Sequence, residues 1–375
     1  MANTRRQTNY ELLRIISMFM VVAMHYLYRS DALLILGESA DAKRLTGTLL
    51  ESFCIVAVNV YVLISGYFLV EAGYKTKRIL ILVCQVLFYA ILIPFIMAGA
   101  GVIGGSGESG PYRLLSYIFP IETEHYWFAT SYVFLYLFTP VLNIAVKNMS
   151  KKQLQITLGG LLLLFSVMKS ISPVQFVTDH FGYDFGWFLC VYLVAAYIRL
   201  YGIKWFSTAK RAWLSYVGCA LCVFAIVCGA FFLNKATGSF AYYFTVPFHY
   251  NYIFCLLGAV ALFYAFSYVK IKSGKAASFI CRISPLTFGV YLFHEHMDIR
   301  SEWTGWIDEF IGPAAAGGVA GFLLHLILSV VIVYLAGIFI DAIRLILFEY
   351  VGRLLSKTRL SAWVAKLDQQ FIGKE

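Results

Sequence analysis

Long apolar segments alternate with short polar connections along almost the whole chain. A helix needs about 20 largely apolar residues to cross a bilayer, and the pattern contains ten candidate segments. They cover Tyr10–Tyr28, Leu49–Val70, Ile79–Ala98, Trp127–Ala145, Leu154–Val167, Trp187–Leu200, Trp213–Leu233, His249–Tyr268, Leu286–Asp298 and Gly318–Asp341. The pattern predicts an all-α, polytopic integral membrane protein. We expect a single membrane domain over residues 1–345 and a basic tail over residues 346–375.

Composition and charge narrow this picture. Hydrophobic residues make up 61% of the chain and charged residues only 13%, which excludes an ordinary soluble domain. The net charge of +10 includes 30 Lys and Arg residues. With the N-terminus in the cytoplasm, 22 of these lie on the cytoplasmic side, seven on the opposite side and one inside a segment. This bias predicts an N-in, C-in orientation, with the lipid bilayer rather than nucleic acid as the partner.

Charged and polar residues inside the first segment are the strongest sign of function. Arg14 and His25 are eleven residues apart. That is about three turns, so both lie on one face of a helix with an axial offset of about 16 Å. Glu11 precedes Arg14 by three residues, which is neighbour spacing on a helix. A charge inside a bilayer costs about 3 kcal/mol and usually faces protein or water. This face predicts a site within the membrane, with His25 as its acid–base group.

A second group of polar residues is expected near the outer side of the membrane. The short ninth segment ends with His294 and Glu295, and the fourth begins at Trp127. Ionisable residues at this depth line protein or a cavity, so these residues are candidates to bind a substrate beside His25. The spacing of His294 and His296 suits a metal poorly, and most cysteines lie in apolar segments. We therefore expect no metal site and no disulfide framework.

Structural roles remain open for each of these residues. His25 can be a buried histidine bonded to a neighbouring helix, and Arg14 can form a structural ion pair with Glu11. Trp127 can anchor the chain at the membrane interface, and His294 can serve packing alone.

The connection after the second segment carries three cations within four residues, Lys75, Lys77 and Arg78. Such a cluster sets membrane topology by default. Lys and Arg also suit contacts with phosphate. An anionic ligand at the cytoplasmic surface is an equal alternative.

Motifs in four places, in this order, resemble the membrane acyltransferase-3 family, whose bacterial members O-acylate cell-surface polysaccharides. The first segment is similar to the family's acidic-x-x-Arg opening and its Arg-x10-His motif. The second segment, followed by the basic loop, is similar to a Ser-Gly-Phe/Tyr-Leu signature. The matching residues are Glu11-Leu-Leu-Arg14 with His25, Ser65-Gly66-Tyr67-Phe68-Leu69, His125-Tyr-Trp127-Phe128 before Tyr136-Leu-Phe-Thr-Pro140, and Tyr291-Leu-Phe-His294. The chain departs from the family in Glu11, which replaces the usual Asp and keeps its charge.

The resemblance implies transfer of an acyl group, most often acetyl, from cytosolic acyl-CoA to a hydroxyl of a cell-surface or lipid-linked glycan. Acetyl-CoA is then a co-substrate, and no cofactor is bound permanently. The enzyme would lie in the plasma (inner) membrane, and its oligomeric state stays open. The implied catalytic residues are His25, Arg14 and Glu11, the donor-binding residues are Lys75, Lys77, Arg78 and Ser65, and the acceptor-binding residues are Trp127, His294, Glu295 and Asn59.

A transporter or flippase of a lipid-linked glycan is the competing class. It shares the spans, the aromatic residues and the buried charges. Acyl transfer measured with the donor on one side of a sealed membrane separates the two classes.

Overall fold

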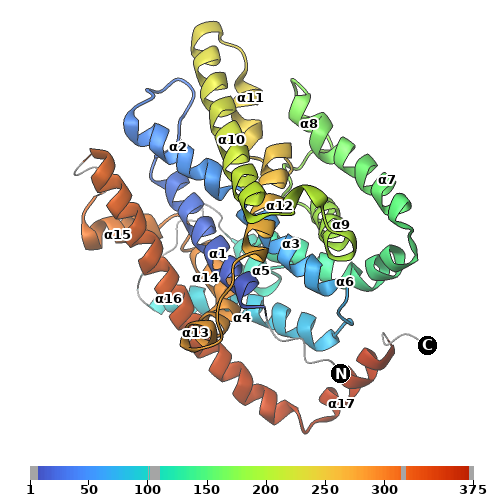
Figure 1. Cartoon of the computed structure of the whole chain (residues 1–375). Helices are drawn as coiled ribbons and strands as arrows, with labels where there is room; N and C mark the ends of the chain where they lie inside the picture. Colours follow the sequence, from blue (N-terminus) through green and yellow to red (C-terminus); the bar gives the residue numbers. More distant parts are fainter. Residues whose placement is uncertain (1–6, 100, 102–109, 314–317, 371–375) are drawn as a thin grey trace.

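The computed structural model describes residues 7–99, 101, 110–313 and 318–370 and is built from helices (Figure 1). Within these residues no strand is present, because a bilayer leaves each backbone polar group to find its partner within the segment. The same residues contain nine helical stretches that are long and apolar enough to cross a membrane, and the shorter apolar helix Phe185–Tyr201. Each of the ten predicted segments has a helical counterpart. The prediction of an all-α, multi-pass membrane protein is confirmed, and its orientation stays a prediction.

The helices that match the ten segments follow the order of the chain. They are α1 (Thr8–Arg29), α2 (Ala42–Cys54) with α3 (Ala57–Leu69), α4 (Thr76–Gly99), α6 (Trp127–Asn148), α7 (Lys151–Leu162) with a π-helical turn (Leu163–Val167) and α8 (Met168–Ile171), α9 (Phe185–Tyr201), α10 (Ala209–Thr237), α11 (Ala241–Thr245) with a 3-10 turn (Val246–Phe248) and α12 (Ile253–Ser267), α13 (Lys275–Ile283) with a 3-10 turn (Ser284–Leu286) and α14 (Thr287–His294), and α16 (Gly318–Leu355). The other elements are α5 (Pro111–Ile118), a 3-10 turn (Lys204–Phe206), α15 (Trp303–Ile311) and α17 (Arg359–Gln370).

The second segment differs from its predicted bounds, Leu49–Val70. Its helical structure begins at Ala42, and Ile55 and Val56 separate α2 from α3. The first turns of α2 are polar, so the apolar pattern could not show that the helix begins before Leu49. Glu51 lies on α2, and its side chain is buried.

The ninth segment also differs from its predicted bounds, Leu286–Asp298. Its helices run from Lys275 to His294, and the residues after His294 form turns. Exposed Lys275 and Arg282 interrupt the apolar residues of α13, so the predicted start of this segment, Leu286, lies after the true start of the helix.

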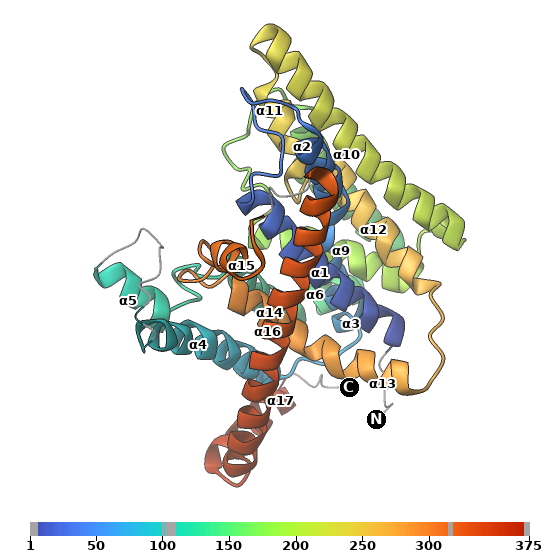
Figure 2. The same cartoon turned by 90° about the vertical axis from the view of Figure 1, so that its left-hand side faces the viewer.

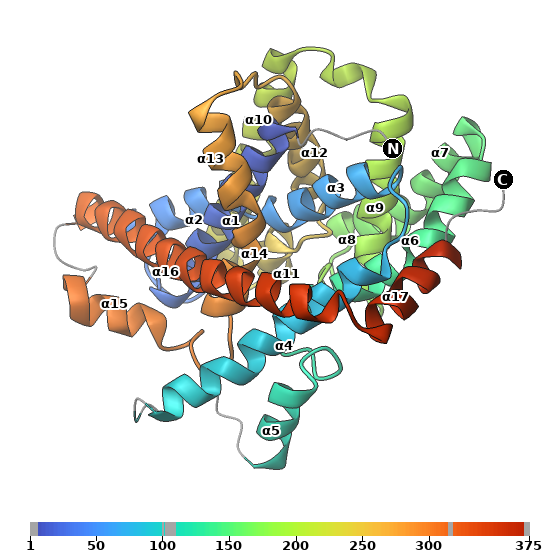
Figure 3. The same ribbon diagram turned by 90° about the horizontal axis from the view of Figure 1, so that it is seen from below.

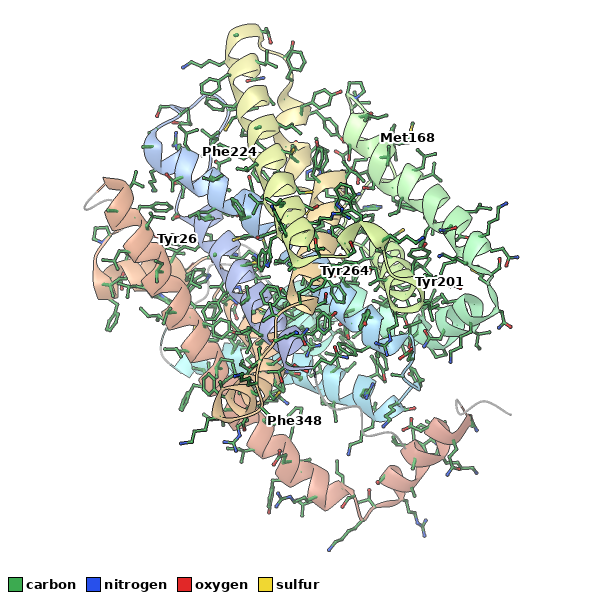
Figure 4. All side chains as sticks on the ribbon, in the orientation of Figure 1. Tyr26, Met168, Tyr201, Phe224, Tyr264 and Phe348 are labelled. Atoms are coloured by element: carbon green, nitrogen blue, oxygen red, sulfur yellow. The ribbon has the colours of Figure 1, made fainter. Side chains whose placement is uncertain are left out.

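Helix α1 occupies the centre of the bundle (Figures 1 and 2). It packs against α2, α3, α12, α13, α14 and α16. Leu13, Val22, Tyr26 and Leu27 on α1 are almost completely buried, so α1 is enclosed although it carries polar residues. The outward faces of the outer helices carry exposed apolar side chains instead. Figure 4 shows side chains filling the space between helices, while Met168 lies on an outer helix and is exposed, as suits a face turned to lipid.

A buried polar cluster fixes α14 between α16 and α4, two helices that cross near it in the view from below (Figure 3). Asp341 accepts hydrogen bonds from Gln85 at 2.9 Å and Tyr89 at 3.1 Å, and Arg344 pairs with it at 2.5 and 2.9 Å. Gly289 of α14 lies so close to Asp341 that a Cβ atom there would overlap the carboxylate. Small residues permit such close helix packing in membranes. This contact helps to position α14, and with it the residues that follow Gly289.

Candidate active site

A cavity of about 500 Å³ opens among α1, α2, α6 and α14 and the connection between α11 and α12. Its walls are mostly apolar, which is typical of ligand pockets. Charged and aromatic residues line it, among them His25, Arg29, Glu51, Trp127 and Glu295. The cavity therefore brings together three of the residues that the sequence singled out, namely His25, Trp127 and Glu295.

His25 and His294 form a direct contact in the wall of this cavity. Nδ1 of His25 lies 2.8 Å from Nε2 of His294, and Nδ1 of His294 lies 2.6 Å from the carbonyl oxygen of Val290. A carbonyl oxygen can only accept, so His294 must donate from Nδ1 and accept at Nε2 when neutral. His25 then donates from Nδ1, which leaves Nε2 of His25 as the unprotonated ring nitrogen. This tautomer is the one a general base needs.

Glu295 supplies negative charge beside the same imidazole. Its Oε1 lies 3.3 Å from Nδ1 of His25 and 2.8 Å from Nη2 of Arg29. A carboxylate at Nδ1 stabilises the imidazolium that forms when Nε2 takes a proton. Nη1 of Arg29 is buried and lacks a hydrogen-bond partner among the described residues. Arg29 itself lines the cavity, and its guanidinium places a positive charge where a developing negative charge would be stabilised.

His25, His294 and Glu295 also form a group whose candidate ligand atoms lie within 4.8 Å of one another. Three such ligands are the minimum for a catalytic zinc site. However, Arg29 already pairs with Glu295, and this positive charge opposes a second cation. The expectation of no metal site stays a prediction.

Aromatic rings form another part of the cavity wall. Trp127 is the first residue of α6, and its ring stacks on Tyr250 with a centroid distance of 5.6 Å and an interplanar angle of 19°. Tyr183 lies 4.5 Å from Trp127 and 4.7 Å from Tyr250. These three rings make a broad apolar face with phenolic groups at its edge. Such a face suits the ring of a sugar.

His294 itself does not line the cavity. Its side chain is completely buried, and it reaches the cavity only through His25. The residue was expected to bind the acceptor directly. Its place in the structure instead suits orientation of His25.

Glu11 and Arg14 lie near the other end of α1 and do not line the cavity. Nη1 of Arg14 is 2.9 Å from Glu11, whose Oε2 accepts a hydrogen bond from Ser284 at 2.5 Å. The hydroxyl of Tyr61 donates to the carbonyl oxygen of Arg14 at 3.0 Å, and Tyr61 lines the cavity. Tyr61 thus connects the backbone of Arg14 to the cavity wall.

Asn59 and Ser65 also lie outside the cavity wall. Asn59 is fully buried, donates to the carbonyl oxygen of Tyr250 at 2.7 Å and accepts from the ring nitrogen of Trp187 at 2.9 Å. It therefore holds one ring of the aromatic face in place. Ser65 is half-buried on α3.

Lys75, Lys77 and Arg78 are exposed in the connection from α3 to α4 and in the first turn of α4. The neighbouring Thr76 donates its backbone N–H to Asp368 of α17 at 2.5 Å. A second cavity of about 420 Å³ at the start of α1 is bordered by Lys270 and Lys272. The described chain thus offers two basic places for an anion, and the sequence singled out the first.

Sequence reasoning missed Arg29, Glu51, Tyr183 and Tyr250. Arg29 follows His25 by four residues, which is the spacing of neighbours on one helix face. Glu51 is a carboxylate inside an apolar segment, and the rule that identified Arg14 would have found it. Tyr183 and Tyr250 carry no local signal, because only the folded chain brings them to Trp127.

A separate polar cluster holds α5 against the end of α14. Arg113 and Tyr117 bond the buried carboxylate of Asp298 at 2.7 and 2.8 Å. His125 lies next to His296, with a ring-centroid distance of 4.6 Å. Burial lowers the pKa of His125 to about 4. This cluster is a structural anchor for the connection that leads to Trp127.

A family profile described as an acyltransferase domain matches residues 7–341 of the chain. No curated protein and no solved structure matched. The match covers most of the chain and includes α1, the aromatic face and α14. The chain therefore belongs to the acyltransferase-3 family and is a membrane acyltransferase.

Proposed function

We propose that this acyltransferase moves an acetyl group from cytosolic acetyl-CoA to a hydroxyl of a cell-surface or lipid-linked glycan. The observation that carries the proposal is the contact between His25 and His294 in the cavity wall, which assigns the proton of a neutral His25 to Nδ1 and leaves Nε2 to accept one. A neutral imidazole with a fixed tautomer is suited to take a proton from a hydroxyl. The plasma membrane would hold the enzyme.

The chemistry follows from this arrangement. Nε2 of His25 takes the proton of the acceptor hydroxyl while the hydroxyl oxygen attacks the thioester carbonyl. Glu295 stabilises the resulting imidazolium, and Arg29 donates to the negatively charged oxygen of the tetrahedral intermediate. The carbon–sulfur bond then breaks, and the imidazolium returns its proton to the leaving thiolate. The products are the O-acetyl ester and free CoA.

Donor and acceptor would approach from opposite ends of α1. Acyl-CoA is a polyanion, and Lys75, Lys77 and Arg78 are exposed at the end that we expect to be cytoplasmic. The long thiol-bearing arm of CoA would extend along α1 past Arg14 towards Tyr61 and the cavity. The glycan would enter beside Trp127.

The test uses purified protein in sealed proteoliposomes, with labelled acetyl-CoA on one side. The acceptor is surface polysaccharide from cells that lack the protein, treated with mild alkali to remove existing esters. We expect label in the polysaccharide, released again by mild alkali. The proposal is wrong if the polysaccharide stays unlabelled, or if lipid-linked glycan crosses the membrane without acyl transfer. Mass spectrometry of surface polysaccharide with and without the protein then locates the ester.

A further inference from the structure

The side chain of Glu51 is a buried carboxylate in the cavity wall that none of the steps above uses. It lies on α2, near the break between α2 and α3, and is only 8% exposed. It lines the same cavity as His25 and Trp127. Its position therefore places a negative or hydrogen-bonding group in the space where an acceptor would lie.

Glu51 makes no side-chain hydrogen bond or ion pair with the described residues. Its Oε2 atom is buried and lacks a hydrogen-bond partner among these residues. The backbone carbonyl oxygen of Glu51 accepts a hydrogen bond from the backbone N–H of Ile55, but this bond does not involve the side chain. Burying an unsatisfied carboxylate is unfavourable for folding. A ligand hydroxyl in the cavity would give this group the hydrogen-bond partner that the described residues do not supply.

The surroundings of Glu51 indicate what kind of ligand fits. Tyr183 and Tyr250 line the same cavity as Glu51, and both belong to the aromatic face beside Trp127. Nδ1 of His249, on the same cavity, is also buried without a partner. An aromatic face beside groups that accept and donate hydrogen bonds matches a sugar, which has apolar ring faces and hydroxyls at its edge.

We propose that Glu51 binds the acceptor glycan by accepting a hydrogen bond from a hydroxyl other than the one that is acylated. Glu51 then fixes which hydroxyl meets Nε2 of His25 and acts as a specificity-determining residue. This inference rests on the proposed acyl transfer to a glycan. It assigns no role to Glu51 in donor binding.

The experiment compares wild type, Glu51→Ala, Glu51→Gln and the control Glu38→Gln. Glu38 is an exposed carboxylate outside the cavity that pairs with Arg44 at 3.3 Å. Three quantities are measured with alkali-treated surface polysaccharide as the probe. They are the KM of acetyl transfer for the polysaccharide, the rate of acetyl-CoA hydrolysis without acceptor, and binding of the polysaccharide without donor. Thermal unfolding in nanodiscs reports on stability.

We expect Glu51→Ala to raise the acceptor KM by about tenfold or more, as loss of a buried hydrogen bond to the ligand predicts. The rate of acetyl-CoA hydrolysis should stay within about twofold of wild type, because the lost hydrogen bond is made to the acceptor and not to acetyl-CoA. The unfolding temperature should not fall, because the substitution removes an unsatisfied buried group. Glu51→Gln keeps one accepting oxygen and should lie between wild type and Glu51→Ala.

Two results would overturn the inference. One is an unchanged acceptor KM in Glu51→Ala, and the other is an equal loss of transfer and hydrolysis, which makes Glu51 part of the donor site or the fold. The proposed function fails separately. If wild type binds the polysaccharide through Glu51 but transfers no acetyl group, the acyltransfer reaction is wrong and the glycan site remains. If wild type does not bind it at all, the glycan site is wrong too.

Discussion

The Nδ1 atom of His25 lies 2.8 Å from Nε2 of His294, although 269 residues separate the two in the sequence. Because His294 also bonds the carbonyl oxygen of Val290, the contact determines which nitrogen of His25 is free. Several outcomes depend on this one relationship.

Replacing His25 by alanine should abolish transfer while the protein still inserts and folds. A general base contributes about 10²–10⁴-fold to a rate, so transfer by His25→Ala should fall by at least about 100-fold. Steady-state transfer of labelled acetyl groups measures the rate, and thermal unfolding in nanodiscs checks the fold. Substantial turnover by a folded His25→Ala protein would remove His25 from the reaction.

Replacing His294 by alanine should lower transfer and acetyl-CoA hydrolysis in equal proportion. The buried His294 orients His25, which serves both reactions, and it does not line the cavity. The acceptor KM should stay unchanged. His294→Gln, whose carbonyl can accept the same hydrogen bond from His25, should recover part of the rate. A selective loss of transfer would instead assign His294 to acceptor binding.

Replacing Trp127 by alanine should lower transfer but not hydrolysis, unlike the replacement of His294. Trp127 stacks on Tyr250 and faces the cavity, so its loss should reduce transfer to glycan and spare hydrolysis. Trp127→Phe retains a ring and should keep more activity. The matched control is Trp205→Ala, which removes an exposed tryptophan outside the cavity. Equal loss of both rates in Trp127→Ala would argue for a role in folding.

Neutralising Lys75, Lys77 and Arg78 together should raise the KM for acetyl-CoA more than the KM for the acceptor. The effect should be largest at low salt, where surface charges are least screened. Replacing Lys204 and Lys210, two exposed cations elsewhere, by glutamine provides the control. An unchanged donor KM at low salt would leave the three residues as topology signals. Replacement of Lys270 and Lys272 then tests the second basic cavity.

Stability should depend on the protonation of His125. Burial lowers its pKa to about 4 from about 6.5. Protons bind the unfolded chain first as pH falls, so stability is present above about pH 6.5 and declines towards pH 4, by up to about 3 kcal/mol. The unfolding temperature of wild type should therefore fall more than that of His125→Gln between pH 7.5 and 5. His180→Gln, at an exposed position, is the control, and equal slopes in all three proteins would contradict the assignment.

The sequence predicted the helices well because a bilayer requires long apolar segments, and these are visible without knowing their neighbours. The predicted bounds were wrong where polar residues lie in the first turns of a helix, as at Lys43 in α2 and Lys275 in α13. The site was predicted in part. His25 stands out because a histidine inside an apolar segment is unusual, whereas Tyr183 and Tyr250 look like ordinary membrane aromatics. Their role depends on helices far apart in the sequence coming together, which spacing along one helix cannot indicate.

The close approach of Gly289 to Asp341 has a consequence for how this chain can vary among its relatives. Any side chain at position 289 requires a smaller one at position 341, and a change at 341 also releases Arg344 and Gln85. Substitutions at these two positions should therefore occur together. The contact between α14 and α16 at these two positions thus limits which sequences can keep the imidazole of His294, which follows Gly289 by five residues on α14, in place.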